Sequence, residues 1–95
     1  MRTIQELEKD LEKTKKELWE ATQKKFDIIS LINYYKALER TRMIVKKHTE
    51  KLRDEKISDD FRLYLKGRLT RATVEDIPNY LERIDFFEKK LGYKD

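Results

Sequence analysis

The stretch Phe26–Val45, FDIISLINYYKALERTRMIV, is the part of this sequence that decides the fold. Apolar residues occur on every side of its helical wheel, whereas the sequence before and after it is amphipathic or charged. A helix that is apolar all round is normally buried. A chain of 95 residues has little material with which to cover such a helix on all sides. We therefore expect a homo-oligomer, most simply a dimer, with its interface at Phe26, Ile29, Ile32 and Tyr35.

Upstream of this stretch, the sequence predicts a helix that begins at Thr3. Thr3 and Glu6 have the spacing of a capping box, in which side chains satisfy free backbone N–H groups. The apolar residues that follow recur at the spacing of a coiled-coil seam, with Thr14 filling one slot. A seam this narrow is not stable alone, so it needs a partner helix from the same chain or from another copy. The seam consists of Ile4, Leu7, Leu11 and Leu18.

Residues 1–56 fit two arrangements. No glycine or proline interrupts residues 1–66, so one helix from Thr3 to about Lys56 is consistent with the sequence. A break near residues 22–30 would instead give a helical hairpin. We favour the break, because a compact core is hard to build from one long helix.

The C-terminal third predicts two further helices. Ser58 or Asp59 can cap the first, and Gly92 stands where a left-handed residue ends the last. Pro78 fits a first helical turn, so a separate tight turn is expected at residues 73–76. The expected buried faces consist of Phe61, Leu65 and Leu69 in one helix and of Ile77, Leu81, Ile84, Phe87 and Leu91 in the other.

These patterns predict an all-α fold in a single domain, residues 1–95. Only two glycines and one proline are present, which favours long helices over a sheet with many turns. We expect a small bundle of three to four helices. A long coiled-coil-like helix or helical hairpin occupies residues 1–56, and a C-terminal αα-hairpin occupies residues 58–92.

The net charge of +4 is localised. Residues 36–56 hold eight basic and four acidic side chains, and a second basic cluster follows in residues 62–71. Such a surface can track phosphates, although a solvated face with ion pairs explains the same pattern. The candidate phosphate-binding residues are Lys36, Arg40, Lys47, Lys51, Arg62, Lys66, Arg68 and Arg71.

Few residues suit catalysis or metal binding. The chain has no cysteine and one histidine, His48, and its two glycines are isolated. Disulfides and cysteine-based sites are therefore excluded, and no metal motif or phosphate-cradling loop is recognisable. We expect no catalytic residue, no bound cofactor and no metal. The charged N-terminal sequence and the lack of a long apolar run predict a cytoplasmic protein without a membrane span.

Two functions remain in competition at this level. The first is a non-catalytic helical protein–protein interaction module that self-associates, as a small adaptor or regulator would. The alternative is a basic nucleic-acid-binding accessory protein that contacts phosphates through residues 36–71. The first is favoured by the all-round apolar stretch, and the second by the localised basic excess.

Overall fold

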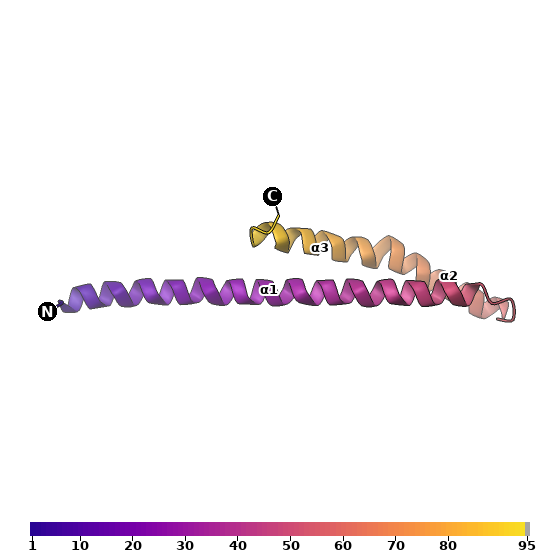
Figure 1. Cartoon of the computed structure of the whole chain (residues 1–95), viewed down its shortest axis with the longest axis horizontal. Coiled ribbons are helices and arrows are strands. Elements are labelled where there is room, and N and C mark those ends of the chain that lie inside the picture. The colour runs from indigo at the N-terminus through magenta and orange to yellow at the C-terminus, as the bar shows by residue number, and fades with distance from the viewer. Residues whose placement is uncertain (95) are drawn as a thin grey trace.

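The computed structural model describes residues 1–94 and shows two helical rods lying side by side over part of their length (Figure 1). The first rod is helix α1, Ile4–Leu52. After a loop at residues 53–58, the second rod runs back along α1 and consists of α2, Asp59–Arg71, η1, Ala72–Asp76, and α3, Ile77–Lys90. The molecule measures 83 × 23 × 15 Å. The prediction of an all-helical fold with a long N-terminal helix is confirmed for the described residues.

Helix α1 is continuous, so the favoured break near residues 22–30 is wrong. Its 49 residues contain no glycine or proline, and nothing in the sequence forces the chain to turn. Three threonines inside it, Thr14, Thr22 and Thr49, lie in continuous helix, and each hydroxyl donates to the carbonyl four residues earlier over 2.7–2.8 Å. At its start, the Thr3 hydroxyl accepts from the Glu6 N–H at 3.2 Å, so the predicted N-cap is confirmed.

The count of three to four helices is also wrong, because residues 59–90 form one uninterrupted helical run. The tight turn expected at residues 73–76 is instead the π-helical turn η1, in which the Ile77 N–H donates to the Ala72 carbonyl. Pro78 sits in the first turn of α3, as predicted. Since a proline ring clashes with the carbonyl four residues earlier, a wider turn before Pro78 lets the helix continue. The helical hairpin therefore consists of the second half of α1 and this continuous rod.

Side-chain and backbone caps hold the ends of the second rod. The Ser58 hydroxyl accepts from the Phe61 N–H at 3.2 Å, which confirms the predicted start of α2. At the other end, Gly92 has a φ of +78°. Its N–H donates to the Lys89 carbonyl, and the Tyr93 N–H donates to the Glu88 carbonyl at 2.9 Å. This is a Schellman motif, and it confirms Gly92 as the left-handed C-cap.

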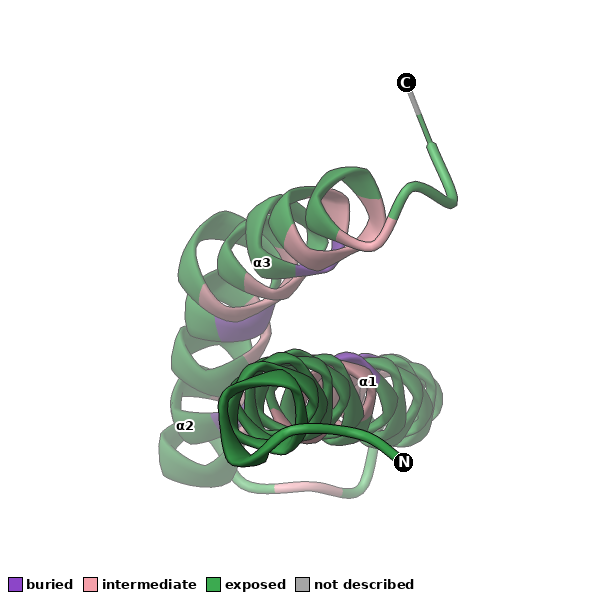
Figure 2. Ribbon diagram, turned by 90° about the vertical axis from the view of Figure 1, so that its left-hand side faces the viewer, coloured by how far each residue is buried: buried purple, intermediate pink, exposed green. Residues whose placement is uncertain are grey.

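Among residues 1–94, the core lies between the second half of α1 and the returning rod. Leu31 and Leu38 of α1 meet Ile84 of α3, and Tyr34 stacks on Phe87 with ring centroids 5.9 Å apart. The most deeply buried side chain is Leu65 of α2, which is 1% exposed. Figure 2, turned by 90° from Figure 1, shows the buried and half-buried positions where the rods face one another. The all-round burial expected for residues 26–45 does not occur within one chain.

Candidate interaction surfaces

The N-terminal arm, defined here as residues 4–21 of α1, has no partner within the described chain. Every residue of the arm is exposed, and Figure 1 shows this end of α1 running on beyond the end of α3. The seam leucines and isoleucine of the arm are 53–76% exposed. Exposed apolar residues scattered singly are ordinary, whereas several apolar residues along one side of a helix are typical of an interaction surface. The exposed apolar side chains of the arm are Ile4, Leu7, Leu11, Leu18 and Trp19.

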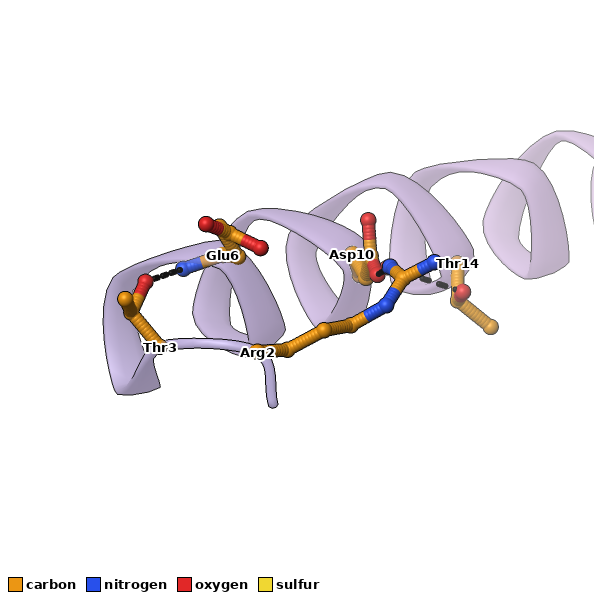
Figure 3. Close-up of polar contacts among 5 residues, drawn as sticks. All are labelled: Arg2, Thr3, Glu6, Asp10 and Thr14. Atoms are coloured by element: carbon orange, nitrogen blue, oxygen red, sulfur yellow. Dashed lines mark hydrogen bonds and ion pairs between the residues drawn. The ribbon is translucent and has the colours of Figure 1, made fainter.

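The polar contacts of the arm are local (Figure 3). Arg2 pairs with Asp10 at 2.8 Å, and the Thr14 hydroxyl donates to the Asp10 carbonyl at 2.8 Å. Surface ion pairs of this kind contribute between 0 and about 1 kcal/mol. The arm continues the hydrogen bonding of α1 and needs no helix nucleus of its own. Its apolar row is not covered by any other described residue of the chain.

The apolar row continues into the middle of α1. The four residues predicted as an interface, Phe26, Ile29, Ile32 and Tyr35, are all exposed, at 42–56%. Leu31 and Leu38, which lie between and beyond them in sequence, are buried against the second rod. The structure thus divides the apolar stretch into a face that packs within the chain and a face that stays open. The predicted interface did not include the exposed arm residues, because a hairpin in residues 1–56 would have covered their seam.

Tyr35 marks the border between these two faces. Its hydroxyl donates a hydrogen bond to Glu88 of α3. This bond, together with partial burial and the negative charge of Glu88, raises the pKa of the Tyr35 phenol above its ordinary value of 10.0. Close by, Asp27 of α1 pairs with Lys90 of α3 at 3.1 Å. These two contacts attach the last turns of α3 to the middle of α1 and leave the arm free.

A second charged cluster secures the C-terminal turn. Asp85 pairs with Lys94 at 2.8 Å and with Lys89 at 2.9 Å. The hydrogen bond from the Lys94 ammonium group lowers the pKa of the Asp85 carboxyl most, and the hydrogen bond from the Lys89 ammonium group lowers it further. The same contact with Asp85 raises the pKa of Lys94. Since these side chains are 36–54% exposed, the two ion pairs add little to the stability of the fold.

The eight candidate phosphate-binding residues fall into two sets. The α1 set, Lys36, Arg40, Lys47 and Lys51, is exposed and lies on the side of α1 opposite Leu31 and Leu38, given about 100° per residue. Among residues 1–94, no carboxylate lies within ion-pair distance of these four side chains.

The set on α2 is partly engaged within the chain. The guanidinium of Arg62 donates to the Leu52 carbonyl at 2.7 Å and to the Asp54 carbonyl at 3.1 Å. Arg62 therefore satisfies free carbonyls where α1 ends, a structural task that removes it from a phosphate-binding surface. The remaining members are Lys66, which is exposed, Arg68, whose guanidinium lies 6.0 Å from the Tyr64 ring centre, and Arg71, 3.8 Å from Glu75.

Open hollows lie between the rods. One, of about 570 Å³, has Arg42 with Leu38 and Glu88 in its wall. A smaller one of about 290 Å³ places Arg68 and Arg71 beside Ile44 and Asp76. Within residues 1–94, no three histidine or acidic side chains gather as a metal site would require.

In the part of the chain described here, no helix has the length and apolar character needed to cross a bilayer. No protein-family model, no curated protein and no solved structure matches this chain.

Proposed function

We propose that this protein is a non-catalytic helical interaction module that self-associates through α1. A single observation carries the proposal: apolar side chains from Ile4 to Tyr35 stay exposed along a helix that packs against the second rod through Leu31 and Leu38. Fully burying a leucine or isoleucine side chain gains about 1.5–3 kcal/mol. Pairing two such rows would bury many of these side chains at once, which favours association of two copies.

The test is sedimentation equilibrium of the full chain from low micromolar to several hundred micromolar. We expect a reversible monomer–dimer equilibrium. Leu11→Gln, in the middle of the exposed row, should shift the equilibrium towards monomer. Lys16→Gln is the matched control, because it introduces the same glutamine on the other side of the same arm. A protein that remains monomeric at the highest concentration would overturn the proposal.

A second function is favoured by the α1 basic set, Lys36, Arg40, Lys47 and Lys51. Four exposed cations on one helical face, without ion-pair partners among residues 1–94, suit contact with a phosphate backbone. Under this alternative, the protein is a nucleic-acid-binding accessory protein that recognises charge rather than base sequence.

Fluorescence anisotropy of a labelled duplex, titrated at several salt concentrations, tests this second function. Binding through four phosphate contacts should give a slope of log K against log salt of about −3 to −4. Replacing the α1 basic set by glutamine should abolish the binding. The control variant removes the same charge from the arm, at Lys9, Lys13, Lys15 and Lys16. Equal losses in both variants would show a non-specific charge effect and count against the α1 surface.

A further inference from the structure

We infer, on the basis of the self-association proposed above, that the N-terminal arm of one copy pairs with residues 21–35 of a second copy. The two α1 helices run antiparallel, and the two-fold axis lies between Leu18 and Ala21. Each arm then covers Ile28, Ile32 and Tyr35 in the middle of the partner's α1. The surface is thus a single self-complementary patch, as a two-fold dimer requires.

The order of residues along the seam favours this orientation. Continuing the spacing of three and four residues from Ile4 places Thr14, Ala21 and Lys25 among the seam positions. In the antiparallel register, Thr14 faces the partner's Lys25 and Leu18 faces the partner's Ala21. The polar seam residues then share a layer, and the large side chain fills the space beside the small one. The other layers are apolar and consist of Ile4 with Tyr35, Leu7 with Ile32, and Leu11 with Ile28.

A parallel, in-register pair makes poorer layers from the same residues. Lys25 would face the partner's Lys25, which places two like charges at the seam. Ala21 would face the partner's Ala21, which leaves a void between the helices. Voids and unpaired charges in an interface both oppose association.

The charges beside the seam select one antiparallel register. In the proposed register, Glu17 lies beside the partner's Lys24, and the symmetry makes this favourable pair twice. If the two-fold axis lay seven residues nearer the N-terminus, Asp10 would lie beside the partner's Glu17. In the register halfway between, Glu17 would lie beside the partner's Glu17 and Lys15 beside the partner's Lys15. Both alternatives place like charges together. Charges beside a coiled-coil seam set partner orientation and register in this way.

The surface needed for this pairing is open in the single chain. Ile32 and Tyr35 are exposed, and Ile28 is half-buried. The second rod lies on another side of α1, where Asp27 pairs with Lys90. Figure 2, which looks along α1, shows α2 to the left of α1 and α3 above it, with neither helix on the right-hand side. The apolar seam also ends where the pairing ends, since the next seam positions after Tyr35 are Glu39 and Arg42.

Disulfide trapping tests the orientation directly, because the chain has no cysteine of its own. In the proposed dimer, Leu11 lies against the partner's Ile28, while the two copies of Leu11 are about 25 Å apart. Leu11→Cys and Ile28→Cys are prepared separately, one of them labelled with ¹⁵N, and are oxidised alone and as a mixture. We expect a disulfide-linked dimer only from the mixture, containing one labelled and one unlabelled chain.

A Leu11→Cys protein that cross-links efficiently with itself would overturn the antiparallel register, while self-association would stand. Sedimentation of the unaltered chain as a pure monomer would overturn both. A second pair of variants guards against damage from the cysteines. Glu17→Lys and Lys24→Glu should each raise the dimer dissociation constant about tenfold, and the double variant should restore it. If the double variant does not recover the original dissociation constant, the proposed contact is contradicted. Recovery would have to come from the contact between copies, because exchanging the two charges does not restore ion pairs within one helix.

Discussion

The arm of α1, residues 4–21, and the packed half, residues 27–52, are one continuous helix with opposite surroundings. The arm is exposed at every position, whereas the packed half buries Leu31 and Leu38 against the second rod. At 1.5 Å per residue, α1 is about 74 Å long and the run from Asp59 to Lys90 is about 48 Å. The second rod is therefore too short to cover α1, and the arm is the part left over. The chain thus forms helix in α1 both where the second rod covers it and where nothing in the chain does.

The largest expected difference between the two regions concerns single leucines. Leu65→Ala removes the most deeply buried side chain and should lower the free energy of unfolding by about 2–4 kcal/mol. Leu11→Ala in the arm should change it by less than about 1 kcal/mol at concentrations where the protein is monomeric. Urea denaturation at low micromolar concentration measures both. If both variants lose the same free energy of unfolding, the arm is packed within the single chain, and the difference between the arm and the packed half does not exist.

The junction between α1 and α2 should come next in size. Arg62→Met removes the guanidinium that donates to the Leu52 and Asp54 carbonyls. We expect a loss of about 1–2 kcal/mol, because charged hydrogen bonds to carbonyls are strong and this group is partly exposed. Lys66→Met, one turn further along α2, is exposed and serves as the control. If both variants unfold at the same urea concentration, Arg62 does not hold the end of α1.

The two glycines should respond in opposite directions. Gly67→Ala places a methyl group in open space within α2 and should stabilise the packed half by about 0.5–1 kcal/mol. Gly92→Ala forces a side chain onto a residue with φ of +78° and should destabilise it by about 1 kcal/mol. Thermal unfolding followed by circular dichroism gives both values. A destabilising Gly67→Ala would show that α2 packs more closely than the structure indicates.

The smallest effect should appear at the border between the two regions, at Tyr35. The pKa of its phenol is raised above 10.0 in the folded protein by the bond to Glu88. The folded state therefore favours the neutral phenol, and this stabilisation is present below pH 10 and lost as the pH rises through the folded pKa. Tyr35→Phe should flatten the fall in stability measured between pH 9 and 11.5. Tyr64→Phe, which removes a hydroxyl from α2, is the control, and an equal change in both variants would contradict the assignment to Tyr35.

Local features of the fold were predictable because each depends on a few neighbouring residues. The caps at Thr3 and Ser58, the place of Pro78 in a first turn and the left-handed Gly92 are all confirmed. Each depends on a backbone preference or on a side chain bonding within three residues. The break in residues 22–30 was wrong, because it was inferred from the need for a compact core rather than from a local breaker. The separate turn at residues 73–76 was wrong because the π-helical turn η1 accommodates Pro78 without ending the helix.

The candidate surfaces were predictable in outline only. The sequence places Phe26, Ile29, Ile32 and Tyr35 in an apolar stretch, and the structure leaves all four exposed. It could not show that Arg62 is engaged, since that contact joins residues ten apart across a loop. It also could not show that the arm lacks a cover, because this depends on where the second rod ends.

By itself, the sequence determined that this chain is helical, where its helices are capped and which residues form an apolar seam. These properties follow from backbone preferences and from a repeat of three and four residues, and both act over short distances. Only the tertiary structure decided which side of α1 is covered and which is open. That decision depends on the length and path of the second rod, and on the Asp27–Lys90 and Tyr35–Glu88 contacts between residues more than fifty positions apart.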